Sequence, residues 1–127
     1  MLIKTPISLA ELLDKISILI LKEKNIKDEN KLILIRKELK YLNAVLDKNI
    51  SKNKIHNYLE SLLEVNTKLW NIEDDIRNCE KNKQFDQKFI DLARSVYFTN
   101  DKRSEIKLKI NKEFGSEIVE VKSYEEY

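Results

Sequence analysis

The chain's single tryptophan lies on a polar stripe of a predicted helix, beside two side chains of opposite charge. In LWNIEDDIR (69–77), Trp70, Glu73 and Arg77 follow one another at spacings of three and four residues. Glutamate four residues before arginine is the favourable order for an ion pair within a helix, and at a surface such a pair contributes about 0.3–0.5 kcal/mol. An aromatic ring beside an arginine also suits a ligand that carries a phosphate or carboxylate. The stripe therefore indicates either a solvated surface pair or one wall of a binding site.

Polar residues also interrupt an apolar stripe closer to the C-terminus. The apolar positions that begin at Phe89 continue in steps of three and four to Asn100 and Arg103, and apolar residues resume at Ile106. Polar groups in such a stripe form either a buried hydrogen-bonded network or the floor of a pocket. A buried arginine also needs an acidic partner. By this reasoning, the acids available to Arg77 and Arg103 are Glu73, Asp74 and Asp101.

The beginning of the chain supplies a third group of charged residues. Glu11, Asp14 and Lys15 lie in the otherwise apolar first turns of the first predicted helix. Acids spaced E-x-x-D on facing helices can hold Mg²⁺, as in all-α nucleoside triphosphate pyrophosphohydrolases. That arrangement needs a second acidic pair, for which Asp74 close to Arg77 is a poor substitute. A P-loop, a nucleophile elbow and a Cys–His pair are absent, and we expect no metal or cofactor.

The overall composition excludes several classes of protein. Lys and Arg number 24 against 22 Asp and Glu, a net charge of +2, so binding to nucleic acid or an acidic membrane surface is not expected. One Cys and one His exclude an internal disulfide and a Cys- or His-rich metal site. The N-terminus does not have the pattern of a signal peptide, and no apolar run is long enough to cross a bilayer. We therefore expect a cytoplasmic protein.

One glycine and one proline leave little room for tight turns, so long helices are expected. Apolar residues repeat every three to four positions, and this pattern predicts a single all-α domain, an antiparallel bundle of about four long helices. The predicted helices are Ser8–Asn25, Asp28–Lys48, Asn53–Asn82 and Asp86–Phe114. Gly115 is well placed to end the last helix in a left-handed conformation. Residues 116–127 are predicted either to pair as a short strand with the N-terminus or to form an extended arm on a partner subunit.

Four blocks of sequence carry a resemblance to a known family. These blocks are DKISIL (14–19), VNTKLWNIEDDIR (65–77), FIDLARSVYFTNDKRSEIK (89–107) and SEIVEVKSY (116–124). Over nearly its whole length, the chain resembles a family of small bacterial proteins of unknown function. The family's members are often encoded near glycosyltransferase or surface-polysaccharide genes. The resemblance implies no particular activity.

The family's polar pattern falls largely on the residues selected above by their spacing. The positions that match are Asp14, Lys15, Asn66, Trp70, Glu73, Asp74, Arg77, Arg94, Tyr97, Asn100, Asp101, Arg103 and Lys107. The chain departs from the family at Ile20 and Val121, where other members often carry acids. An acid at either position is therefore not expected to be indispensable.

These observations lead to one expected function and two alternatives. The leading hypothesis is a non-enzymatic binding or adaptor module with a polar pocket between helices for a small anionic ligand, such as a sugar phosphate or nucleotide-sugar. Arg77 and Arg103 would bind the anion, and Trp70 and Tyr97 would stack on a sugar or base. The alternatives are a Mg²⁺-dependent enzyme acting on a phosphorylated substrate, and a structural protein with a sealed polar network. A homodimer is expected. The residues assigned to the pocket are Trp70, Glu73, Asp74, Arg77, Tyr97, Asn100, Asp101, Arg103, Lys107, Asp14 and Lys15, and those assigned to the Mg²⁺ alternative are Glu11, Asp14, Asp74 and Asp101.

Overall fold

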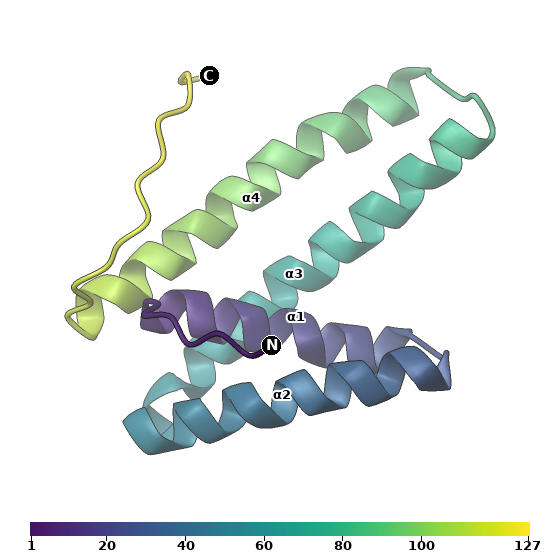
Figure 1. The fold of residues 1–127 in the computed structure, drawn as a ribbon. Helices are drawn as coiled ribbons and strands as arrows, with labels where there is room; N and C mark the ends of the chain where they lie inside the picture. The colour runs from purple at the N-terminus through teal and green to yellow at the C-terminus, as the bar shows by residue number, and fades with distance from the viewer.

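Four long helices account for most of the chain, as the sequence predicts. A computed structural model describes residues 1–127 and contains no strands. The helices are α1 (Leu9–Asn25), α2 (Glu29–Asn49), α3 (Lys52–Lys81) and α4 (Gln87–Glu113). Figure 1 shows that consecutive helices run in opposite directions, so that they form two hairpins, α1–α2 and α3–α4. None of the helices is long and apolar enough to span a membrane.

Local hydrogen bonds set most of the helix ends. The Ser8 hydroxyl accepts from the Glu11 amide at 3.1 Å, and the Asp28 carboxylate accepts from the Lys31 amide at 3.0 Å. Each bond satisfies an amide that has no partner within its own helix. Gly115, at φ +62°, ends α4 as predicted, and the next amide, of Ser116, donates to the carbonyl of Asn111. The capping residues thus determine where α1, α2 and α4 begin or end.

Helix α1 is the centre of the fold because it packs against all three other helices. Its residues Leu19 and Leu21 lie about 200° apart round the helix and are 4% and 5% exposed, so α1 is buried on more than one side. Figure 1 shows the α1–α2 hairpin lying across one end of the α3–α4 hairpin. The buried core formed at this crossing consists of Ala10, Leu12, Leu13, Ile16, Leu46, Ile55, Leu62, Val65 and Ile110.

The other end of the α3–α4 hairpin extends beyond this core. Among residues 67–102, only Cys79 is buried. The apolar positions between these parts of α3 and α4, such as Leu69 and Val96, are half-buried. Two helices alone cannot enclose a core, so the polar sides of both helices stay accessible here. The stripe that carries Trp70 lies in this region.

The C-terminal segment does not form the β pairing that we considered for it. Residues 117–127 have no regular structure and run back along α4 (Figure 1). Side chains hold this segment: Glu120 accepts from Lys107 of α4 at 3.2 Å, and the ring of Tyr127 lies 5.2 Å from that of Tyr97 and 5.0 Å from that of Phe98. Because the segment is anchored to α4 by side chains, it makes no backbone ladder with the N-terminus. The segment instead lies extended on α4 of its own chain.

Candidate functional site

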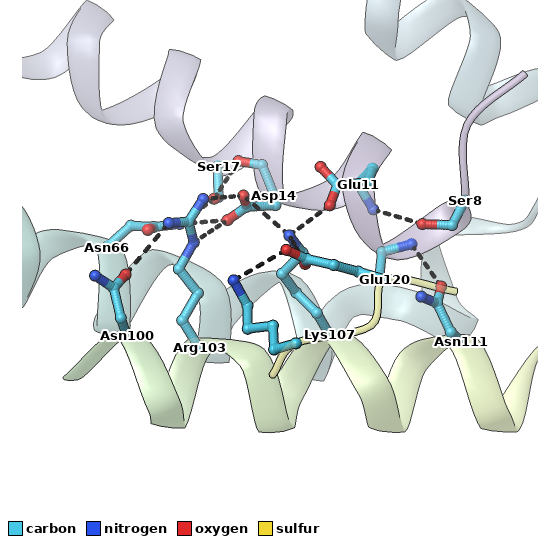
Figure 2. A network of polar contacts seen from close by, with 12 residues as sticks. Ser8, Glu11, Asp14, Ser17, Asn66, Asn100, Arg103, Lys107, Asn111 and Glu120 are labelled. Carbon is cyan, nitrogen blue, oxygen red and sulfur yellow. Dashed lines mark hydrogen bonds and ion pairs between the residues drawn. The ribbon is translucent and has the colours of Figure 1, made fainter. Parts of the chain in front are cut away.

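A buried carboxylate lies where α1 crosses α3 and α4. Asp14 of α1 is 2% exposed, and its Oδ1 accepts from the Asn66 amide at 2.9 Å and from Arg103 Nε at 3.0 Å. Its Oδ2 accepts from Arg103 Nη2, so the guanidinium binds the carboxylate through two parallel hydrogen bonds. Figure 2 shows these groups pointing toward one another from three helices. The ion pair therefore ties α1 to α4, and the amide ties both to α3.

A serine completes the inner side of this network. Ser17 is 0% exposed; its hydroxyl donates to the backbone carbonyl of Asp14 at 2.7 Å and accepts from Asn66 Nδ2 at 2.8 Å. No buried side-chain nitrogen or oxygen atom lacks a hydrogen-bond partner. Because unpaired buried polar groups are costly, this pairing is what allows the polar residues to occupy a core position.

Two further residues of α4 extend the network toward the start of α1. Lys107 Nζ lies 2.5 Å from Glu11 Oε1, 3.2 Å from Glu120 Oε2 and 4.0 Å from Asp14 Oδ2. One turn further along α4, the side-chain oxygen of Asn111 accepts from the Ala10 amide at 3.2 Å. The polar positions of α4 thus follow at intervals of four residues from Arg103, all facing α1 (Figure 2).

The charges of this network shift the pKa values of two of its members. The hydrogen bonds to Asp14 raise the pKa of Arg103, in spite of the burial that opposes them, so the guanidinium stays charged. Hydrogen bonds from Lys122 and Lys107 lower the pKa of Glu120. Both shifts favour the ionised forms of these two side chains.

An open cleft of 510 Å³ borders the outer side of Arg103, between α1, α3 and α4. Asn100 and Arg103 lie on its floor, where Arg103 Nη1 is 3.5 Å from Asn100 Oδ1. This distance is at the limit for a hydrogen bond, so the Nη1 edge of the guanidinium is less tightly held than the edge that binds Asp14. The cleft is lined by Ile18, Leu21, Asn66, Leu69, Trp70, Glu73, Asp74, Arg77, Val96, Asn100 and Arg103.

The wall of the cleft formed by α3 carries the ion pair predicted from spacing. Arg77 Nε is 3.4 Å from Glu73 Oε2, and the two side chains are 80% and 55% exposed. This exposure makes the pair weak, so Arg77 is free to leave Glu73 for another anion. The lining side chains Glu73 and Asp74 equal Arg77 and Arg103 in number, and the buried Asp14 adds a negative charge behind Arg103. The cleft is therefore polar without a strong field of either sign.

The remaining predicted site residues do not line this cleft. Lys15 is exposed on α1, whereas Lys107 is buried within the network, where it pairs with Glu11. Tyr97 and Asp101 face the C-terminal segment and line a second hollow of 720 Å³, in which the Tyr127 hydroxyl donates to Asp101. A ligand that stacks on both Tyr97 and Trp70 would therefore have to occupy the cleft and the second hollow at once. The two are adjacent, because Val96 and Asn100 line both.

The acids expected to hold the two arginines are only partly the ones observed. Glu73 pairs with Arg77, but Asp14 holds Arg103, and Asp101 bonds Tyr127 instead. The prediction took the acids from the helices that carry the two arginines, whereas the partner of Arg103 lies on α1, 89 residues away. Sequence reasoning also missed Ser17, Asn111 and the role of Glu120. The first two carried a detectable signal, because each lies one helical turn from a polar residue on a buried stripe.

The four acids of the Mg²⁺ alternative do not converge. Glu11 and Asp14 are bound by Lys107 and Arg103, Asp74 lines the cleft, and Asp101 lies under the C-terminal segment. No group of three or more His, Cys, Asp or Glu side chains is placed to hold a metal ion. The geometry thus gives this alternative no ligand set.

The fold and site define an all-helical protein in which two crossed hairpins enclose a paired polar network beside an open polar cleft. The chain belongs to a family of unknown function, DUF6165, whose model matches residues 3–127. No curated protein and no solved structure shows significant similarity to it.

Proposed function

We propose that the protein is a binding module whose cleft takes a small ligand with one anionic group and a hydroxyl-rich body, such as a sugar phosphate or nucleotide-sugar. One observation carries this proposal: Arg77, Asn100 and Arg103 line the same open cleft, although they come from two helices. Trp70 lies on α3 beside Arg77 and lines the same cleft, and an aromatic face is a suitable platform for a sugar ring or a base.

The ligand class follows from which donors and acceptors remain free. Arg103 is committed to Asp14 through two bonds, so Arg77 is the cation that would bind a phosphate or carboxylate. Glu73 and Asp74 would accept hydrogen bonds from hydroxyl groups of the same ligand. Because Asp14 already pairs with Arg103, Arg77 is the one uncommitted cation beside Glu73 and Asp74, and a ligand with several negative charges would gain less here than one with a single anionic group.

The chain's single tryptophan makes this proposal directly measurable. Trp70 lines the cleft, so its fluorescence reports on the cleft alone. Glucose 1-phosphate and UDP-glucose are suitable probes, with glucose as the neutral comparison. We expect the phosphorylated probes to change Trp70 emission with saturation, and Arg77→Met to abolish that change without altering the thermal unfolding midpoint.

Arg36→Met is the matched control. Arg36 Nε is also 3.4 Å from a glutamate, Glu23, and its side chain is 56% exposed, but it lies on α2 away from the cleft. This variant should bind the probes as the wild type does. Absence of any saturable response to both phosphorylated probes, or equal loss in the two variants, would refute the proposed ligand class.

A purely structural role is the second candidate, and the complete pairing of the Asp14 network favours it. In that case the network would fix how the two hairpins cross, and the cleft would be a by-product of two helices extending beyond the core. The two candidates differ in Arg77, which the structural role does not use. A broad panel of sugar phosphates that leaves Trp70 emission unchanged would favour the structural role.

A further inference from the structure

Helix α2 has an apolar side that no part of the chain covers. Leu32, Ile35 and Leu46 of α2 are buried where α2 meets α1. At about 100° per residue, a second set of large apolar side chains lies roughly 100° round the helix and faces solvent. These are Leu34, Tyr41 and Val45, which are 68%, 51% and 47% exposed. Figure 1 shows α2 at the edge of the molecule, with α1 on one side of it only.

The exposed stripe has a symmetrical spacing. With Glu38, which is also exposed, its members are Leu34, Glu38, Tyr41 and Val45, at steps of four, three and four residues. The order reads apolar, acceptor, donor, apolar in one direction, and apolar, donor, acceptor, apolar in the other. A two-fold axis perpendicular to the helix therefore places every member against a complementary one.

We propose that this stripe is the interface of a homodimer in which α2 packs antiparallel against α2 of a second copy. Leu34 of each copy lies opposite Val45 of the other, and Glu38 lies opposite Tyr41. The two tyrosine hydroxyls donate to the two glutamate carboxylates at the centre, and the apolar pairs close both ends. The interface is isologous, as in most homodimers, and a partner of different sequence would lack this reciprocal match.

The dimensions of the stripe predict a weak association. Residues 34–45 span about 16 Å of helix at about 1.5 Å per residue. A contact along one helix of this length buries less than the roughly 800 Å² per partner of a standard interface, so we expect a dissociation constant on the order of 100 µM. The same register brings Lys31 of each copy to Lys48 of the other. Salt screens this repulsion, so association should strengthen as ionic strength rises.

A charge-swap experiment tests both the surface and the register. Sedimentation equilibrium would be measured for the full chain, for Leu34→Lys and for Val45→Glu. Each variant places two charges in the apolar end pairs, so self-association should weaken by about tenfold or more. In an equimolar mixture of the two variants, the introduced lysine of one copy meets the introduced glutamate of the other at one end, while the native Leu–Val pair remains at the other end. A heterodimer should therefore form where neither variant associates alone.

Ile33→Lys is the control, because Ile33 is 62% exposed on the same helix but lies off the stripe. It should self-associate as the wild type does, and all variants should keep the wild-type circular dichroism. A wild-type chain that stays monomeric at about 1 mM would overturn the proposal, given the expected constant. A mixture that fails to associate would overturn the register. A monomer that instead binds anionic vesicles through Leu34 and Val45 would assign the stripe to a membrane surface and overturn the dimer.

The dimer and the cleft are independent. The cleft is lined by α1, α3 and α4 only. The α2 variants should therefore leave the Trp70 response unchanged, and failure of one proposal leaves the other standing.

Discussion

Replacing Arg103 by methionine should destabilise the protein strongly, because it removes the main partner of a buried charge. Methionine keeps most of the aliphatic length of the arginine, so the change isolates the guanidinium. The Asp14 side chain is 3% exposed and would keep only the Asn66 amide and Lys107 Nζ at 4.0 Å. Breaking a buried pair by removing one partner costs about 3–5 kcal/mol. Arg103 is 28% exposed and Lys107 remains close, so we expect about 2–3 kcal/mol here.

Replacing Asp14 instead of Arg103 should lower the free energy of unfolding by less. In Asp14→Asn, Arg103 can turn toward the cleft and be hydrated, and the new amide can still accept from Asn66. We expect a loss of about 1–2 kcal/mol, which is the usual cost of weakening a charged hydrogen bond. In the double variant Asp14→Asn/Arg103→Met no unpaired charge remains at this pair. Its loss of unfolding free energy should therefore be smaller than the sum of the two single losses by about 1–2 kcal/mol.

Urea unfolding followed by circular dichroism measures these differences. At an m value of about 2 kcal/mol/M, the Arg103→Met loss corresponds to a midpoint lower by about 1–1.5 M. Arg77→Met is the comparison. The Arg77–Glu73 ion pair is exposed, so this variant should lose no more than about 0.5 kcal/mol of unfolding free energy. If Arg103→Met unfolds within about 0.5 kcal/mol of the wild type, Asp14 does not depend on the guanidinium, and the account of the network is wrong.

Three further outcomes are expected, all near the C-terminus. Gly115→Ala should lower the free energy of unfolding by about 1 kcal/mol in the same urea assay, because φ is +62° and no contact compensates the strain; an unchanged value would exclude that conformation. The lowered pKa of Glu120 means that its contribution is present above the ordinary carboxyl pKa and is lost as pH falls through the lowered value. The backbone order of residues 117–127, measured by ¹⁵N relaxation, should therefore fall in acid, and Glu120→Gln should remove that pH dependence. The hydrogen bond to Asp101 raises the pKa of Tyr127 to about 12, so its contribution is present below the ordinary phenol pKa and is lost as pH rises through about 12. The hydrogen bond to Glu113 also raises the pKa of Tyr58, so ultraviolet titration should show late phenols, and Asp101→Asn should return only that of Tyr127 to the ordinary range.

The helices could be predicted from the sequence because the causes are local. Ser8 and Asp28 cap helices through bonds to residues three positions on, and Gly115 ends α4 through its own backbone conformation. The position of Trp70 beside Glu73 and Arg77 also follows from the period of one helix. Each of these features is fixed by residues within about one helical turn.

The contacts between helices could not be predicted in the same way. Which acid binds Arg103 depends on how α1 crosses α4, and periodicity gives the facing side of each helix but not their relative height. The C-terminal segment was equally undetermined, since its anchors are single side chains such as Tyr127. The side of α2 that carries Leu34 and Tyr41 follows from the helical period, but its exposure depends on how α2 packs against α1.

The Asp14 network also bears on how the chain reaches its fold. Its hydrogen bonds join residues 52 and 89 positions apart, whereas contacts within each hairpin are closer in sequence. Contacts between residues close in sequence lose less chain entropy when they form, so both hairpins can form before they dock. Until docking, Asp14 and Arg103 are hydrated and cost nothing. Docking in a shifted register would bury the carboxylate without its arginine, at a penalty of several kcal/mol. The network therefore disfavours misaligned hairpins and favours the one alignment in which Asp14 and Arg103 are paired.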